Sequence, residues 1–106
     1  MSNRNREAGH NWEREVVRDL KEMGYKATTA RYSSREVDDS KVDICGVPWN
    51  IQCKVSTKGV PYTSIIASMP EGDNVVANKI IKNKKTLGKY VIIGYLEWLK
   101  LLESQR

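Results

Sequence analysis

The sequence predicts a single α/β domain in which helices flank a mixed central β-sheet. The chain has 106 residues, which is the size of one ordinary domain. Hydrophobic residues make up 40% of it and charged residues 29%, as in globular folds with a packed core. The hydrophobic spacing indicates a helix, three strands, an undetermined segment, two strands and a closing helix, an order typical of a mixed sheet covered by helices.

The first helix is expected over residues 11–23, because its apolar residues recur at helical spacing and Gly24 is placed to end it. Residues 1–8 are polar and basic, and they are expected to form a flexible N-terminal arm. The folded domain is therefore expected over residues 9–106.

Five strands and several connecting loops are expected after this helix. The strands are expected at Tyr25–Tyr32, Val42–Cys45, Ile51–Val55, Val75–Ile81 and Tyr90–Tyr95. The loops are expected at Ser33–Lys41, Gly46–Pro48, Lys58–Pro61 and Pro70–Asn74, with a basic turn at Asn83–Lys89. Tyr62–Ser68 is compatible with a helix or a strand, and Leu96–Ser104 is expected to be the closing helix.

Composition narrows the classes of function. The chain carries 18 Lys and Arg against 13 Asp and Glu, and this excess favours a polyanionic partner, although solubility alone explains it equally well. Cys45 and Cys53 form neither a disulfide framework nor a zinc motif, so both are expected to be buried thiols. His10 is the only histidine, which argues against a histidine metal site or a Ser-His-Asp triad.

The sequence also predicts the cellular compartment. No apolar run approaches the roughly 20 residues that span a bilayer. The first residues are polar and charged, so no secretory signal is expected. We therefore expect a cytoplasmic protein with no membrane partner.

Glu13 is the candidate catalytic residue of the first helix. At about 100° per residue, the apolar side chains occupy an arc of roughly 140°; they are Trp12, Val16, Val17, Leu20 and Met23. Glu13 falls inside this arc, whereas the other charged residues of the helix, Glu15 among them, fall outside it. A carboxylate on the buried face is costly unless a cation binds it; a salt bridge or a boundary position is the alternative.

The predicted hairpin supplies further candidates. Because side chains alternate along a strand, Gln52 and Lys54 share one face of the returning strand, and Cys53 lies on the other. Asp43 points away from its apolar neighbours in the preceding strand. The hairpin is expected to bring Asp43 to the side of Gln52 and Lys54, although an ordinary half-exposed hairpin shows the same alternation.

These residues resemble a known signature. Asp43, eight intervening residues and then Gln52-Cys53-Lys54 are similar to the PD-(D/E)XK nuclease motif. The segment Gly9–Glu15, followed by Leu20 and Gly24-Tyr25, resembles the opening helix of archaeal and phage Holliday junction resolvases. Val75–Lys79, the basic turn, Val91–Ile93 and the closing helix resemble the second half of that family. The resemblance implies a restriction-endonuclease-like fold in a bacterial or archaeal host cell, with a virus as one source of the gene.

The resemblance also implies the roles of the site residues. Glu13 and Asp43 would bind Mg²⁺, with Mn²⁺ as a substitute, together with Gln52 and the backbone carbonyl of Cys53. Lys54 would orient or deprotonate the attacking water, or stabilise charge on the phosphorane; the sequence leaves these roles open. The implied activity is metal-dependent hydrolysis of DNA phosphodiester bonds.

Two positions depart from the motif. Val42 replaces the proline, and Gln52 replaces the usual Glu or Asp. Because an amide brings no negative charge, metal affinity is expected to be weaker. The departure indicates either a catalytically silent member or compensation by Glu36, Asp38 or Asp39. Retention of Glu13, Asp43 and Lys54 favours an active enzyme.

The DNA surface is expected to consist of phosphate contacts, because no element for reading bases is recognisable. The candidates are Arg4, Arg6, Arg31, Ser33, Ser34, Arg35, Lys58, Lys79, Lys82, Lys84, Lys85 and Lys89. A solvated turn is the alternative for the lysines of residues 79–89. Because a four-way junction has two scissile strands, a homodimer is expected, with apolar surface near Ile65, Ile66, Trp98 and Leu102.

Three other functions remain compatible with the sequence. The first is another nuclease on the same fold, such as a nicking, repair or restriction-like enzyme. The second is a DNA-binding protein without activity. The third is an RNA- or ribosome-associated protein, which would explain the charge but not the position of Glu13.

Overall fold

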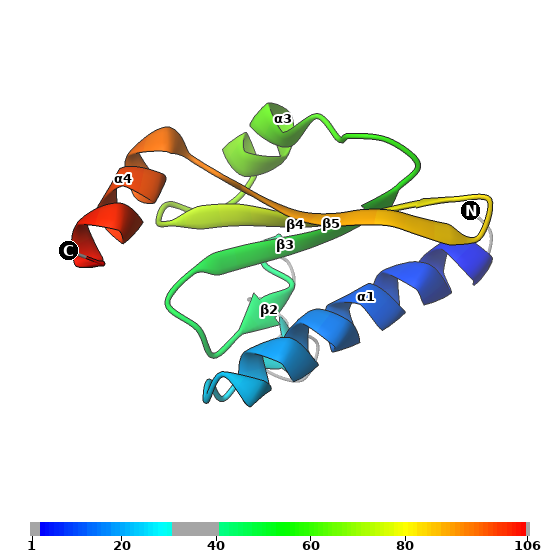
Figure 1. Ribbon diagram of the computed structural model, residues 1–106, viewed down its shortest axis with the longest axis horizontal. Helices are drawn as coiled ribbons and strands as arrows, with labels where there is room; N and C mark the ends of the chain where they lie inside the picture. Colours follow the sequence, from blue (N-terminus) through cyan, green and yellow to red (C-terminus); the bar gives the residue numbers. More distant parts are fainter. Residues whose placement is uncertain (1–2, 31–40, 106) are drawn as a thin grey trace.

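A five-stranded mixed sheet with a long helix across one face forms the centre of the molecule (Figure 1). The computed structural model describes residues 3–30 and 41–105. Within these ranges, α1 lies on one side of the sheet, the short α3 on the other, and α4 at one end (Figure 1). The expected α/β class with a mixed sheet and flanking helices is therefore confirmed.

The first helix, α1, spans Asn3–Glu22 and begins eight residues before the expected start at Asn11. Residues 3–8 are therefore helical and do not form the expected arm. The end of the helix agrees with the prediction. Gly24 has φ of 102°, its N–H donates to Lys21 O at 2.9 Å, and the N–H of Tyr25 donates to Leu20 O at 3.1 Å. This pair of bonds is a Schellman motif, in which glycine accepts the left-handed conformation without steric cost.

The two strands at one edge of the sheet are shorter than expected, and the others are longer. Along the chain, the strands are β1 at Thr28–Thr29, β2 at Ile44–Cys45, β3 at Asn50–Ser56, β4 at Asn74–Lys82 and β5 at Lys85–Ile93. The expected turn at Asn83–Lys89 is wrong for most of its length, because Lys85–Lys89 belong to β5. The actual turn contains only Asn83 and Lys84.

The strands lie in the sheet in chain order, from β1 to β5. The first three pair antiparallel, β3 and β4 pair parallel, and β4 and β5 form an antiparallel hairpin. A parallel pair needs a crossover connection, and this one contains α3 at Tyr62–Ala67. The segment that the sequence left undetermined is therefore helical.

The core lies between α1 and the centre of the sheet. Trp12 is 5% exposed, and its Nε1 donates to Ala77 O of β4 at 2.8 Å. Val17, Ile44 and Ile51 are buried in the same cluster. Met23 was expected to belong to this face but is 72% exposed, because it follows the last helical residue.

The closing helix, α4, spans Tyr95–Ser104, close to the expected bounds. None of its residues is buried, and it lies at the end of the sheet (Figure 1). Its side chains include Leu96 at 66% and Trp98 at 47% exposure. None of the described helices combines the length and the hydrophobicity needed to cross a bilayer.

The turn between β4 and β5 gives a test of this hairpin. Asn83 and Lys84 have φ of 53° and 64°, as in type I′ turns, which favour Asn followed by Gly. Lys84→Gly should therefore raise the free energy of unfolding by about 0.5 to 1 kcal/mol, because relief of left-handed strain exceeds the entropy that glycine adds to the unfolded chain. Urea denaturation measures the change. Lys85→Gly, in the adjoining strand, is the control and should lower stability; equal effects of both variants would contradict the turn.

Candidate active site

Asp43 lies where β2 and β3 separate. Ile44 pairs with Ile51, and the N–H of Asp43 donates to Ile51 O at 2.8 Å. Two residues further along β3, the N–H of Cys53 donates to Oδ2 of Asp43 at 2.8 Å. A side-chain carboxylate thus takes the position of a backbone acceptor. This bond explains why β2 is shorter than the expected Val42–Cys45.

The same bond orients the backbone of Cys53. In an extended strand, the N–H and C=O of one residue point to the same edge. The carbonyl of Cys53 therefore faces the edge of β3 at which the Asp43 carboxylate lies. The expected backbone ligand and the expected aspartate ligand meet at this edge.

Glu13 approaches the same position from α1, which packs against β3. Burial raises the pKa of the Cys53 thiol, and the negative charges of Asp43 and Glu13 raise it further. Both charges act on the same thiol, so Glu13 and Asp43, which are 30 positions apart in the sequence, lie in the same part of the molecule. Cys45 and Cys53 are free and only partly buried.

Gln52 and Lys54 lie on the face of β3 opposite to α1, because the alternate residues Ile51 and Cys53 pack toward the core around Trp12. Their shared face agrees with the prediction. The Asp43 carboxylate accepts a hydrogen bond from the Cys53 backbone and therefore lies at the edge of β3. Gln52 and Lys54 thus lie on one face of β3, and α1, which carries Glu13, packs on the other.

Gln52 has an unusual polar environment. It is 8% exposed, and its Oε1 is buried without a hydrogen-bond donor among the described residues. Buried amide oxygens almost always accept a hydrogen bond, since leaving one without a partner is costly. An oxygen in this state is available to a cation.

The expected donors are of the chemical types that suit a hard divalent cation. They comprise the carboxylates of Glu13 and Asp43, the amide oxygen of Gln52 and the carbonyl of Cys53, and Mg²⁺ prefers oxygen ligands of this kind. Within residues 3–30 and 41–105, no three His, Cys, Asp or Glu residues are grouped as a metal site. The expected set contains only two carboxylates, so it does not require such a group.

Asn78 is a site residue that the sequence analysis missed. It is 2% exposed, and its Nδ2 donates to Lys54 O at 3.1 Å and to Ser56 Oγ at 3.1 Å. These bonds fix the part of β3 that carries Lys54. The signal was an asparagine within an apolar strand, where this residue type is uncommon.

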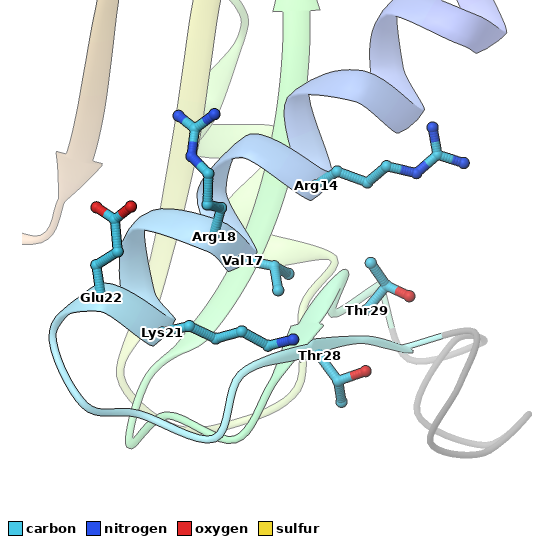
Figure 2. Close-up of a pocket in the computed structure, with 7 residues that line it drawn as sticks. All are labelled: Arg14, Val17, Arg18, Lys21, Glu22, Thr28 and Thr29. Atoms are coloured by element: carbon cyan, nitrogen blue, oxygen red, sulfur yellow. The ribbon is translucent and has the colours of Figure 1, made fainter.

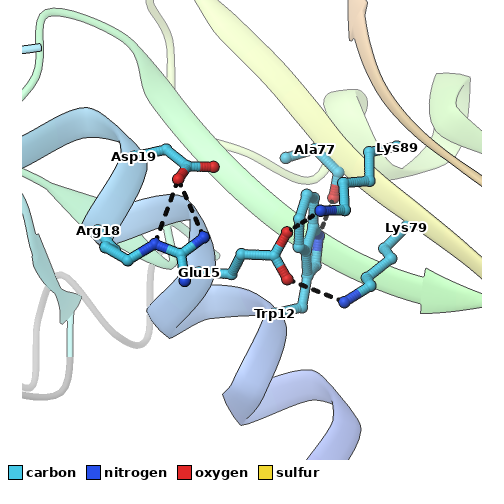
Figure 3. Close-up of polar contacts among 7 residues, drawn as sticks. All are labelled: Trp12, Glu15, Arg18, Asp19, Ala77, Lys79 and Lys89. Carbon is cyan, nitrogen blue, oxygen red and sulfur yellow. Dashed lines mark hydrogen bonds and ion pairs between the residues drawn. The ribbon is translucent and has the colours of Figure 1, made fainter. Parts of the chain in front are cut away.

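Glu15 corrects the predicted surface of α1 (Figure 3). Its side chain is only 15% exposed, and it forms ion pairs with Lys79, at 2.9 Å, and with Lys89. Lys79 also lies over the Trp12 ring, 5.5 Å from the centroid. The prediction that Glu15 faces water is therefore wrong. Lys79 and Lys89, expected to contact DNA, are held by this carboxylate.

The ion pairs change the titration of Glu15. Burial by itself raises the pKa of this carboxyl, but hydrogen bonds and charges from Lys89 and Lys79 outweigh it and hold the pKa below 4.5. Because the folded state favours the ionised form, the interaction stabilises the protein above pH 4.5. The stabilisation is lost as the pH falls through the lowered pKa.

Those of the remaining basic candidates that the structure describes lie at one end of the molecule. Lys58 follows β3, and the turn with Lys82, Lys84 and Lys85 follows the parallel strand β4, so both are at the same end. The start of α1, with the exposed Arg6, lies there too (Figure 1). Arg31, Ser33, Ser34 and Arg35, the acidic residues Glu36, Asp38 and Asp39, and the side chain of Arg4 lie outside the described part of the chain.

No protein-family model matches this chain, and no detectably similar curated protein or solved structure was found. The functional argument therefore depends on the geometry of the edge of β3 and on its chemistry.

The Glu15 ion pairs give a test by substitution. Glu15→Gln should lower the free energy of unfolding by about 1 to 2 kcal/mol at pH 7, because two partly buried lysines lose their carboxylate. The difference from the parent should shrink between pH 7 and pH 3, because the carboxyl takes up a proton as the pH falls through its lowered pKa. Urea denaturation at both pH values measures it. The control, Asp19→Asn, removes an ion pair with Arg18 whose side chains are 57% and 65% exposed, and it should change little. A loss that is equal at both pH values would contradict the ion-pair account.

Proposed function

We propose that this protein is a metal-dependent DNA endonuclease. The observation that carries the proposal is the buried Gln52 Oε1, which has no donor among the described residues and belongs to the strand whose Cys53 N–H binds the Asp43 carboxylate. A divalent cation held there would polarise a phosphodiester and acidify a bound water. Lys54 lies on the strand beside these oxygens, where its ammonium can orient the water or stabilise charge on the phosphate.

Within this class, we propose a Holliday junction resolvase. The mixed sheet flanked by helices is of the kind that the motif resemblance implies. Lys58, Lys82, Lys84, Lys85 and Arg6 are exposed at one end, which suits contact with phosphates. Within the described residues no element for reading bases is evident, so recognition by DNA shape is the simpler expectation.

A homodimer is part of this proposal, because two symmetric cuts require two sites. The exposed apolar side chains of α4, Trp98 and Leu102 among them, are 47% and 46% exposed and offer the expected surface. Ile65 and Ile66 of α3 are half-buried and contribute less area.

Two of the three alternative functions are tested by the same experiments. Another nuclease on this fold would cut nicked, flapped or linear duplexes in preference to four-way junctions. A silent member would bind DNA without cutting it, and Gln52 in place of an acid favours this reading. An RNA- or ribosome-associated protein explains the charge but leaves the buried Gln52 oxygen without a role.

Cleavage assays test the proposed chemistry. The parent should cut a four-way junction with Mg²⁺ and lose activity when the metal is chelated. Asp43→Asn and Lys54→Ala should each reduce the rate at least about 100-fold while DNA binding is retained, because they remove a ligand and a phosphate-stabilising charge. Asp73→Asn, at an exposed ion pair with Lys100, is the matched control and should cut normally. Unchanged cleavage in the first two variants would refute the assignment of the site.

Substitution of Gln52 tests metal binding without a cleavage assay. In Gln52→Glu, an ionised carboxylate occupies a position that is 8% exposed, so the variant should be destabilised by about 2 kcal/mol or more without metal. Mg²⁺ should restore most of this stability, because it would now bind three acidic ligands. Thermal unfolding with and without Mg²⁺ measures the effect.

The control is Gln105→Glu, which places the same charge at an exposed position at the end of α4. It should show no response to Mg²⁺. A Gln52→Glu variant whose unfolding is equally insensitive to the metal would argue against a cation at this edge.

A further inference from the structure

A pocket of about 610 Å³ lies between the outer side of α1 and β1 (Figure 2). The helix contributes Val17 and the cationic side chains of Arg14, Arg18 and Lys21. The strand β1 contributes the hydroxyl groups of Thr28 and Thr29. In Figure 2, Lys21 extends toward Thr28 and Arg14 extends on the side of Thr29, whereas Arg18 and Glu22 point away from β1. None of these residues belongs to the proposed metal site.

The charge of the pocket is only partly compensated. Arg18 pairs with Asp19 at 3.2 Å, and Glu22 is the acidic residue that lines the pocket among residues 3–30 and 41–105. Arg14 donates to the neutral amide oxygen of Asn11 at 3.3 Å. Among the described residues, neither Arg14 nor Lys21 has a carboxylate partner. Two cationic groups therefore line a concave surface, and no carboxylate of the described part of the chain neutralises them.

Thr29 provides an independent indication of a ligand. The residue is 6% exposed, and its Oγ1 is buried without a hydrogen-bond partner in the described part of the chain. A buried hydroxyl is rarely left in this state, because the lost hydrogen bond to water is not replaced. An anion in the pocket could accept a hydrogen bond from this hydroxyl and ion pairs from the two cations.

We propose that this pocket binds a backbone phosphate of a nucleic-acid strand. The proposal rests on the proposed function, because the pocket adjoins the candidate active site: Arg14 follows Glu13 in α1, and Thr29 pairs with Ile44, next to Asp43. Arg14 and Lys21 supply the charge, and the Thr29 hydroxyl supplies a donor.

The cationic surface continues along α1 beyond this pocket. Arg14 also lines a second pocket of about 390 Å³ with Arg6, His10, Asn11 and the acidic Glu7. At 1.5 Å per residue, the distance along the helix from Arg6 to Lys21 is about 22 Å. A nucleic-acid strand in a duplex rises by this length in about six nucleotides. A strand whose phosphate occupies the first pocket can therefore continue past the second.

Salt-dependent binding tests the proposal. Fluorescence anisotropy with a labelled four-way junction, with divalent metal chelated, gives the slope of log K against log salt. The double variant Arg14→Gln/Lys21→Gln should lose about one to two units of this slope, because each neutralised phosphate contributes about 0.9. The control, Lys26→Gln/Lys100→Gln, removes the same charge at exposed positions that do not line the pocket and should keep the slope. Equal slopes in the two double variants would overturn the proposal.

Thr29→Val separates a ligand contact from a structural role. This substitution keeps the size of the side chain but removes the hydroxyl, so DNA binding should weaken about three- to tenfold while the thermal unfolding temperature does not fall. Parent-like binding would overturn the role of Thr29.

Titration with inorganic phosphate distinguishes a site for a DNA phosphate from a site for a free phosphate ion. Phosphate should compete with DNA only weakly, and displacement of DNA at micromolar phosphate would indicate a free-anion site instead.

The two proposals can fail independently. If the parent does not cut DNA but the Arg14→Gln/Lys21→Gln variant shows a smaller salt dependence of DNA binding, the nuclease assignment fails and the phosphate-binding pocket is retained. If the parent cuts DNA and the Arg14→Gln/Lys21→Gln slope is unchanged, the pocket assignment fails and the nuclease stands. A parent that binds no DNA overturns the pocket proposal as well.

Discussion

The hydrogen bond from the Cys53 N–H to Oδ2 of Asp43 is the interaction on which the candidate site depends. It replaces a backbone bond between β2 and β3, so the two strands separate at this position. The separation keeps the Asp43 carboxylate at the edge of β3 and turns the Cys53 carbonyl toward it. Loss of the bond would let β2 pair further along β3, and the carboxylate would then lie on one face of the sheet.

The position of Glu13 depends on two contacts that flank it in α1. Trp12 donates a buried hydrogen bond to Ala77 O, and Glu15 pairs with Lys79 and Lys89. Both contacts hold the helix against β4 and β5, so Glu13 is carried toward β3. Two carboxylates repel each other, and bringing them together also removes them from water. A residue that is held in place on both sides can approach a second carboxylate in spite of these two costs.

Much of the fold could be predicted from local patterns, because the patterns were long or chemically distinctive. β3 and β4 were predicted almost to their ends, and Gly24 was correctly placed at the end of α1. The short strand β1 was overestimated. The assignment of Lys85–Lys89 to a turn failed because lysines in an exposed edge strand have the composition of a loop.

The sequence by itself determined that Gln52 and Lys54 share a face and that Glu13 lies on the buried side of its helix, because both follow from the periods of strand and helix. Only the tertiary structure decided that Asp43 lies at a strand edge and that Glu15 is paired. Those two outcomes depend on partners at Cys53, Lys79 and Lys89, which are distant in the sequence. Local periodicity carries no information about which distant backbone or charge will meet a side chain.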